Sequence, residues 1–287
     1  MAKPKVAILG IGIMGGGMAG RLLSQGFPLT VYNRKREKCT PFTALGARTA
    51  DSPRDAASQS EIVISMVAND EASREIWLGE KGALAGITAG SLLIESSTLT
   101  SNWIYELSAR ASEHNCPFLD APVTGTKPHA ASGELVFLVG GSEEAVTRAQ
   151  PVFSVLGRET FHLGPTGSGA LMKLVNNFIC GVQAASFAEA LRLIDVGGLN
   201  RAKAISILTN GAPGSGIVKR VAERVAANEY TPNFMVRWMA KDLSYALKEA
   251  STRSISLQTA AAASSIFQRA VAEGHGDEDF SAVTKLL

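Results

Sequence analysis

The chain has 287 residues, of which 46% are hydrophobic and 19% are charged, and its formal net charge is +2. This composition is typical of a soluble globular protein with one or two domains, and it gives no support to a nucleic-acid partner or a membrane surface. No apolar stretch is long enough to span a bilayer, and no signal-peptide pattern opens the chain. The three cysteines, Cys39, Cys116 and Cys180, lie far apart without metal-ligand spacing. We therefore expect a cytoplasmic protein without a metal site.

Short apolar runs separated by longer segments make up the first half of the chain. Strands are expected at residues 5–9, 29–32, 62–67, 91–95, 117–120 and 135–141, and a helix is expected over residues 14–25. Strands that alternate with helices are typical of a mostly parallel sheet covered on both faces.

Only helical patterns follow residue 164. The first, over about residues 169–196, is apolar on nearly every face, so we expect it to lie among other helices. Further helices are expected at residues 201–208, 217–227, 235–251 and 257–273. The sequence thus predicts an α/β domain over residues 1–164 and an all-α domain over residues 165–287.

A glycine-rich motif, Gly-Ile-Gly-Ile-Met-Gly, follows the first expected strand and opens the first helix. Gly10 permits a tight turn, Gly12 lets the backbone approach a pyrophosphate, and Gly15 allows close packing of helix and strand. The helix start, at Ile13 and Met14, offers N–H groups and the positive end of the helix dipole to an anion. A glycine-rich turn without a ligand is the alternative, but this context favours a Rossmann dinucleotide-binding domain.

The end of the second strand bears on the choice between NAD and NADP. NAD sites usually place an acidic residue there to bind the ribose 2′-hydroxyl. This chain instead has Asn33 and Arg34, with Lys38 just beyond. An arginine suits a 2′-phosphate because its planar fork donates two parallel hydrogen bonds. The alternative is a solvated run of surface charge, but its position favours NADP as the cofactor.

A lysine interrupts the long apolar helix. Lys173 lies one turn before Asn177 and shares its face. A lysine in such a helix is costly unless it reaches solvent or has a task, and burial makes a lysine a usable proton donor near neutral pH. Residues 120–126, Asp-Ala-Pro-Val-Thr-Gly-Thr, follow a strand and offer hydroxyl and N–H groups to a carboxylate. A structural lysine and an ordinary polar loop remain the alternatives for each feature taken alone.

Four motifs taken together, at residues 10–15, 120–125, 169–177 and 241–243, resemble the signatures of the β-hydroxyacid dehydrogenase family. The resemblance covers essentially the whole chain. Within the family the chain is most similar to the glyoxylate and succinic semialdehyde reductases, through residues 33–39, 125–128 and 276–283. It implies an oxidoreductase that reduces a small aldehyde acid to the hydroxy acid with NADPH.

The resemblance also implies roles for individual residues. Lys173 corresponds to the catalytic lysine, and Asn177 to the asparagine that supports it and the substrate. Substrate-binding residues would be Thr124, Gly125, Phe234 and Asp242. Cofactor-binding residues would be Gly10, Gly12, Ile13, Met14, Gly15, Asn33, Arg34, Lys38, Val67, Thr98 and Lys241.

The chain departs from the family pattern near the expected substrate loop. Thr124 stands where most members have serine, and Thr126, His129 and Ser132 also differ. These changes leave the identity of the aldehyde acid open. An imine reductase of the same architecture and a non-catalytic NADP-binding module are the alternatives, and Lys173 argues against both. Exposed apolar faces on the helical domain favour a homodimer or homotetramer.

Overall fold

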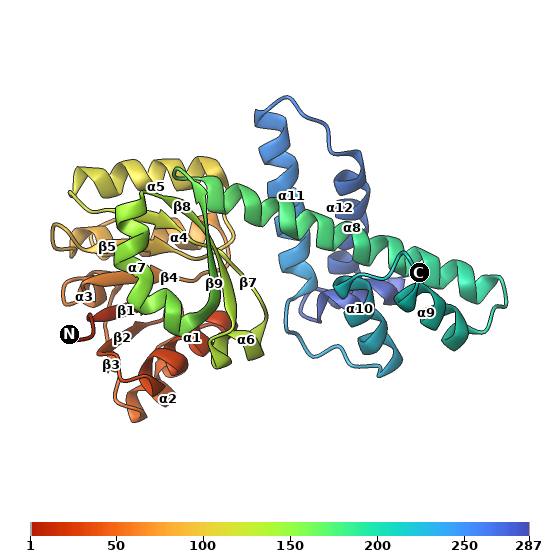
Figure 1. The fold of residues 1–287 in the computed structure, drawn as a ribbon, viewed down its shortest axis with the longest axis horizontal. Helices are drawn as coiled ribbons and strands as arrows, with labels where there is room; N and C mark the ends of the chain where they lie inside the picture. Colours follow the sequence, from red (N-terminus) through yellow and green to blue (C-terminus); the bar gives the residue numbers. More distant parts are fainter. Residues whose placement is uncertain (1, 287) are drawn as a thin grey trace. The chain divides into compact units, whose positions relative to one another are not determined.

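The computed structural model describes residues 2–286, which form two compact units (Figure 1). The first unit extends through Lys173 and the second begins at Leu174, so their boundary falls inside one helix, α8 (Ser168–Val196). The sequence-based boundary at residue 164 lies just ahead of that helix, at the end of the last strand.

The first unit is built on a nine-stranded sheet in the order β3-β2-β1-β4-β5-β6-β8-β7, with β9 paired to β8. The first six strands of this order, from β3 through β1 to β6, run parallel to one another, whereas β8 is antiparallel to both β6 and β7. The strands are β1 (Val6–Leu9), β2 (Leu29–Tyr32), β3 (Arg48–Thr49), β4 (Ile62–Ser65), β5 (Leu92–Glu95), β6 (Phe118–Asp120), β7 (Val123–Thr124), β8 (Leu135–Gly141) and β9 (Gly157–Gly164). The order 3-2-1-4-5-6 is that of a Rossmann fold, which confirms the predicted α/β class.

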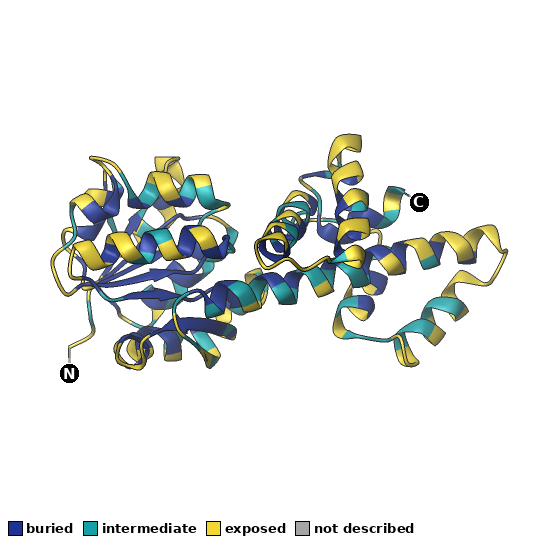
Figure 2. Ribbon diagram, turned by 90° about the horizontal axis from the view of Figure 1, so that it is seen from above, coloured by how far each residue is buried: buried dark blue, intermediate teal, exposed yellow. Residues whose placement is uncertain are grey.

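Helices cover both faces of this sheet (Figures 1 and 2). One face packs against α1 (Ile13–Ser24), α6 (Lys127–Ser132) and α7 (Glu143–Leu156), and the short α2 (Thr40–Ala44) lies beside them. The other face packs against α3 (Pro53–Ala57), α4 (Asp70–Trp77) and α5 (Ser101–Glu113). Alternate residues of β1 enter the two cores, because successive side chains of a strand point to opposite faces.

Three strands differ from the sequence-based expectation. β3 and β7 have only two residues each, too few to produce a pattern. β9 has eight residues, but all of them are exposed or half-buried. Because β9 has no buried face, it lacks the apolar alternation by which strands are recognised.

The second unit is helical, as predicted. It contains α8 beyond Lys173, then α9 (Arg201–Asn210), α10 (Gly216–Ala226), α11 (Val236–Thr252), α12 (Gln258–Ala270), a π-helical turn (Val271–His275) and a 3-10 helix (Phe280–Leu286). Its core includes Phe187, Met239 and Phe267. The expectation that α8 lies wholly among other helices is wrong for a single chain, because Leu193 and Val196 are 74% and 69% exposed.

The close approach of the loop after β1 to the backbone of Met66 can be tested by substitution. Gly10 has φ +104°, and a methyl group there would overlap the Met66 carbonyl oxygen. We expect Gly10→Ala to lower the free energy of unfolding by roughly 1–3 kcal/mol. The matched control is Gly12→Ala, since a methyl at Gly12 meets nothing within 4 Å. Urea unfolding followed by circular dichroism should show a much smaller shift for Gly12→Ala; equal shifts would contradict the geometry.

Candidate functional site

Five loops leave the sheet at one edge, after β1, β2, β4, β5 and β6. The strand order changes direction at β1, which pairs with β2 on one side and β4 on the other. Open α/β sheets bind ligands at the carboxyl ends of their strands beside such a switch point. The sequence-predicted residues Gly10, Asn33, Val67 and Thr98 lie in these loops, and Thr124 ends β7, the short strand that follows the loop after β6. The topology therefore brings them to the same edge.

The first loop presents the start of α1 to open space. Gly12 precedes the helix without a side-chain cap, and nothing lies within 4 Å of a methyl built on it. The first-turn N–H groups, including those of Ile13 and Met14, have no partner within their own helix. A helix start of this kind binds anions through its N–H groups and its dipole. The residues present thus fit the pyrophosphate of a dinucleotide.

Asn33 ties this loop to the loop after β2. Its Oδ1 atom accepts the Ile11 N–H at 3.0 Å, and its Nδ2 atom donates to the Lys35 carbonyl at 2.9 Å. The side chain therefore fixes the distance between the two loops. Sequence analysis placed Asn33 in the cofactor site without this bridging contact.

Arg34 has an acidic neighbour that sequence analysis missed. Its Nη1 atom lies 3.6 Å from Oε2 of Glu75 on α4, and the two side chains are 84% and 58% exposed. An exposed pair of this kind is weak, so Arg34 stays available to a stronger anionic partner. Lys38, which follows shortly after Arg34 in the sequence, is also exposed. The carboxylate at this loop comes from another helix, 41 residues beyond Arg34, where a local motif search does not look.

A buried carboxylate fixes the loops after β4 and β5. Glu95 accepts the Ser97 N–H at 2.9 Å, the Ser73 hydroxyl at 2.6 Å and the Trp77 indole N–H at 2.8 Å. The Ser97 hydroxyl in turn accepts the Val67 N–H at 2.7 Å. Complete burial raises the pKa of Glu95, against the lowering effect of these hydrogen bonds. The network holds Val67 at the sheet edge.

The loop after β7 combines an exposed peptide with a rigid backbone. Thr124 ends β7, and Gly125 follows with φ +128°, a region that favours glycine. A methyl at Gly125 would lie 3.0 Å from Leu135 Cδ2 and 3.2 Å from His129 Cβ. The His129 Nδ1 atom lies 3.1 Å from the Thr126 nitrogen and 2.8 Å from its hydroxyl oxygen. The carboxylate-binding role of Thr124 and Gly125 remains a prediction.

Asp120 connects the end of β6 to the start of α8. Its fully buried carboxylate accepts the N–H groups of Gly167 and Ala170, each at 2.8 Å. Burial raises the pKa of Asp120 to about 6, although these backbone hydrogen bonds act in the opposite direction. Lys173 follows Ala170 by three residues, about one helical turn, and is half-buried. Sequence analysis included Asp120 in a motif but gave it no role.

In the second unit, a buried polar cluster joins α8 to α11. The Asn177 Nδ2 atom donates to Oδ2 of Asp242 at 2.6 Å, and both side chains are buried. The Lys241 ammonium lies 3.1 Å from Asp242 Oδ1 and 5.1 Å from the centre of the Tyr245 ring. Asn176 donates to Asn177 Oδ1 at 2.9 Å. The amide orientation of Asn177 follows from chemistry, because a carboxylate only accepts.

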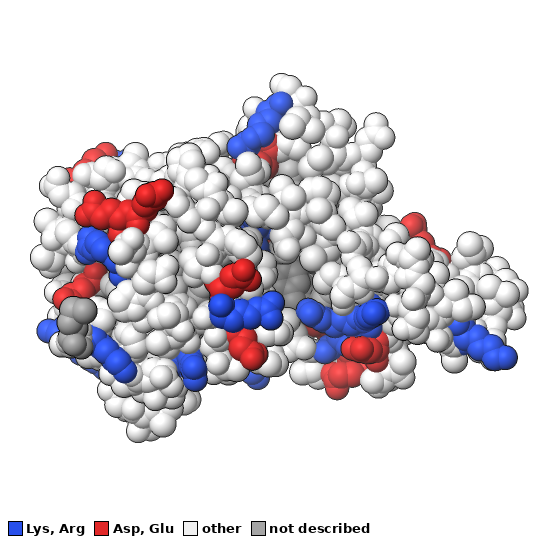
Figure 3. Space-filling model, viewed as in Figure 1, with Lys and Arg blue, Asp and Glu red and all other residues white. Residues whose placement is uncertain are grey.

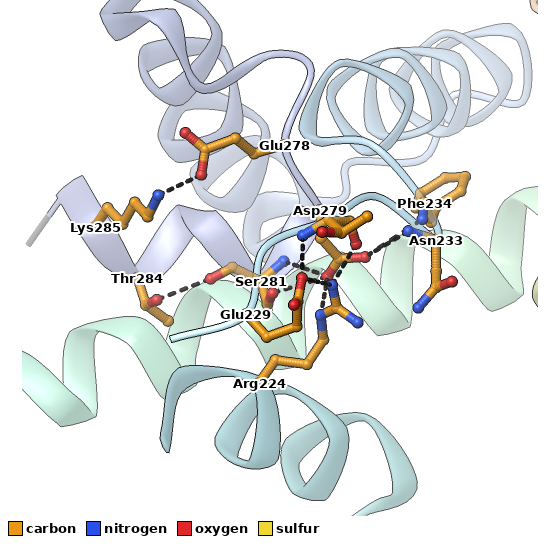
Figure 4. Close-up of polar contacts among 10 residues, drawn as sticks. Arg224, Glu229, Asn233, Phe234, Glu278, Asp279, Ser281, Thr284 and Lys285 are labelled. Atoms are coloured by element: carbon orange, nitrogen blue, oxygen red, sulfur yellow. Dashed lines mark hydrogen bonds and ion pairs between the residues drawn. The ribbon is translucent and has the colours of Figure 1, made fainter. Parts of the chain in front are cut away.

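Phe234 owes its position to a second buried carboxylate cluster (Figure 4). Asp279 accepts the N–H groups of Asn233 and Phe234 at 3.1 and 3.4 Å through Oδ2. Its Oδ1 atom accepts the Ser281 hydroxyl at 2.8 Å and lies 3.2 Å from Arg224 Nε. The Phe234 ring packs against two aromatic rings of the same unit. A substrate contact for Phe234 remains a prediction.

Acidic and basic side chains are interspersed on the face drawn in Figure 3. Within residues 2–286, no three His, Cys, Asp or Glu side chains gather so as to hold a metal ion. In the same part of the chain, every helix is too short or too polar to cross a membrane.

Comparisons with known proteins agree with this architecture. Residues 5–164 match the family described as the NAD binding domain of 6-phosphogluconate dehydrogenase, and residues 167–287 match the NAD-binding family of NADP-dependent 3-hydroxyisobutyrate dehydrogenase. The chain is 34% identical to glyoxylate/succinic semialdehyde reductase 2 of Arabidopsis thaliana, over 98% of this chain and 79% of that protein. It is also 34% identical to the NAD-dependent L-serine dehydrogenase of Pseudomonas aeruginosa, over 99% and 97%.

A solved structure is similar over the whole chain. The 3-hydroxyisobutyrate dehydrogenase of Salmonella typhimurium superposes with a TM-score of 0.90 at 30% identity, over 99% of this chain and 100% of that one. The chain therefore belongs to the β-hydroxyacid dehydrogenase family, as its four motifs predicted. It is an oxidoreductase of that family, and its sheet unit is a domain for a nicotinamide dinucleotide.

The raised pKa of Asp120 makes a prediction about stability. The folded protein favours the protonated carboxyl, so its stabilising contribution is complete below the usual value of 3.8 and is lost as the pH rises through about 6. From about pH 4 to about pH 7, the free energy of unfolding should fall by about 3 kcal/mol more than in Asp120→Asn. Urea titrations of both proteins across this range measure the difference, and parallel pH curves would contradict it.

Proposed function

We propose that this chain reduces a small aldehyde acid, such as glyoxylate or succinic semialdehyde, to the hydroxy acid with NADPH. The observation that carries the proposal is the setting of Lys173. It lies half-buried near the start of α8, one turn after the segment bound by Asp120 and one turn before Asn177. Asn177 is itself bonded to the buried Asp242. A half-buried lysine one helical turn from an ordered polar group on either side along α8 is suited to a defined chemical task.

The proposed mechanism assigns three tasks to the residues of this chain. The Thr124 hydroxyl and the Gly125 N–H bind the substrate carboxylate and so orient the aldehyde. The bound NADPH supplies a hydride to the carbonyl carbon. The Lys173 ammonium stabilises the negative charge that develops on the carbonyl oxygen and then donates a proton to it. The family resemblance also gives substrate-binding or supporting roles to Asn177, Phe234 and Asp242 of the second unit.

The preference for NADPH rests on Arg34. The glyoxylate/succinic semialdehyde reductase and the NAD-dependent L-serine dehydrogenase described above are each 34% identical to this chain. Overall identity therefore does not decide which cofactor this chain uses. The loop after β2 offers an exposed guanidinium in place of an acidic residue. Its fork can hold a 2′-phosphate in two parallel hydrogen bonds. The remaining cofactor contacts would come from the α1 start, Asn33, Lys38, Val67, Thr98 and Lys241.

The proposal includes self-association. Leu193 and Val196 at the end of α8, Leu199 just after it and Ile207 in α9 are each mostly exposed. Exposed large apolar side chains are typical of surfaces that bind another protein. A homodimer or homotetramer would cover them. An imine reductase or a non-catalytic module would share this fold, and Lys173 favours the aldehyde reductase over both.

The cofactor preference can be tested with a matched pair of variants. Arg34→Ala should weaken NADPH binding roughly 10- to 100-fold and NADH binding far less, because one charged hydrogen-bonding partner is lost. Glu75→Gln should strengthen NADPH binding by no more than about fivefold, since it frees Arg34 from a weak exposed pair. Arg36→Ala is the control, because Arg36 is an exposed arginine of the same loop paired with Asp51. Fluorescence titration of the unmodified protein and of the three variants measures their affinities for NADPH and NADH; similar NADPH and NADH affinities in the unmodified protein would refute the preference.

The role of Lys173 can be tested by turnover. Lys173→Met should lower kcat with glyoxylate and succinic semialdehyde by at least about 10²-fold while NADPH binding and folding stay nearly unchanged. Arginine should not restore activity, because a guanidinium retains its proton and has a different shape. Lys219→Met, at an exposed position of α10, is the control. Near-normal turnover in Lys173→Met would remove Lys173 from the mechanism, and activity only in L-serine oxidation would refute the aldehyde substrate.

A further inference from the structure

Asp120 lies between the two chain segments of the sheet unit that carry the proposed chemistry. Four residues after Asp120 the chain reaches Thr124, which would bind the substrate carboxylate. On the other side, Asp120 binds Gly167 and Ala170, and Lys173 follows Ala170 by one turn. One side chain therefore links the carboxylate-binding loop to the helix that carries the proposed proton donor.

Both carboxylate oxygens of Asp120 are committed to α8. Oδ1 accepts the Gly167 N–H and Oδ2 accepts the Ala170 N–H, each at 2.8 Å. The backbone of Gly169 packs so closely that a methyl group there would lie 2.6 Å from the Asp120 carbonyl oxygen. The start of α8 is thus held by two hydrogen bonds and by close backbone contacts at Gly169, which leave it little freedom to turn or slide.

The chemical identity of this cap differs from the others in the sheet unit. Helices α5 and α7 are capped by the neutral hydroxyls of Thr100 and Ser142, which accept the N–H groups of Trp103 and Ala145. A hydroxyl satisfies a helix start without burying a charge. At α8 the chain buries a carboxylate instead, which costs solvation energy. This carboxylate binds two N–H groups at once, which offsets part of that cost.

We propose that Asp120 is a positioning residue that, in its ionised form, fixes the first turn of α8 and thereby holds the Lys173 ammonium in register with the Thr124–Gly125 loop. This inference rests on the proposed function, because it needs Lys173 to be the proton donor.

The ionised form is the one that can bind both N–H groups, since a carboxylate offers acceptors only. Protonation converts one oxygen into a donor, and asparagine places an amide N–H against a backbone N–H. The ionisable groups on the surrounding elements are Glu95, the register partner of Asp120 on β5, then Tyr105 on α5, His162 on β9 and Lys173 on α8. Acidification near pH 6 should take one acceptor away from these N–H groups and so loosen the start of α8 locally, although neutralising the buried charge stabilises the fold as a whole.

The test compares Asp120→Asn with Ser142→Ala and Lys173→Met. Ser142→Ala removes a helix cap of the same unit without touching α8, so it should lower stability and leave kcat and its pH profile unchanged. Asp120→Asn should lower kcat roughly 10- to 100-fold, as expected for a misplaced catalytic group, with NADPH affinity nearly unchanged. In the unmodified enzyme kcat should fall on the acid side with a midpoint near 6, and this limb should be absent from Asp120→Asn.

Each outcome either supports or overturns the positioning role of Asp120. If Asp120→Asn retains the kcat and the acid limb of the unmodified enzyme while Lys173→Met is inactive, the positioning role is overturned and the proposed function stands. Full turnover in Lys173→Met would overturn both. If Asp120→Asn does not fold, the pH profiles of the unmodified enzyme and Ser142→Ala decide, because absence of an acid limb near 6 in both contradicts the inference.

Discussion

Two buried carboxylates hold the loops at the carboxyl edge of the sheet. Glu95 and Asp120 are register partners at the ends of adjacent strands, and both are inaccessible to solvent. Removing two acidic groups from water is costly, so each is surrounded by donors that are already part of the backbone or of neighbouring helices. Glu95 orders the loops after β4 and β5 through Ser97, and Asp120 orders the start of α8. The geometry of the proposed active edge therefore depends on groups that no ligand needs to contact.

Much of the fold can be predicted from the local sequence pattern. The predictions that failed concern side chains that remain exposed to solvent. The limits of β2 and β8 agree with the apolar runs that predicted them, because these strands are almost entirely buried. β9 was missed because its side chains face solvent, so its place is decided by hydrogen bonds to β8 rather than by composition. The apolar character of α8 predicted a helix correctly but did not show which of its faces remain exposed in one chain.

The candidate site likewise contains residues that could be predicted from the sequence and residues that could not. Motif residues such as Gly10 and Asn177 were recognisable because their chemistry is expressed in neighbouring sequence. The partners that position them were not, since Asp120 binds groups 47 and 50 residues away and Asn177 binds Asp242 across 65 residues. Glu75 was missed for the same reason. Sequence spacing records which groups a helix or a loop offers, whereas the topology decides which of these groups meet.

The placement of the last helical residues has a consequence for synthesis on the ribosome. The core of the helical unit includes Phe280, Ala282 and Val283, whereas the cores of the sheet unit need nothing beyond Ala170. The sheet unit can therefore complete its packing while the ribosome is still making α9 to α12. Domains tend to fold in this order during translation. During that interval the side chains of α8 that pack in the helical core have no partner, and exposed apolar surface of this kind favours aggregation after the sheet has already folded.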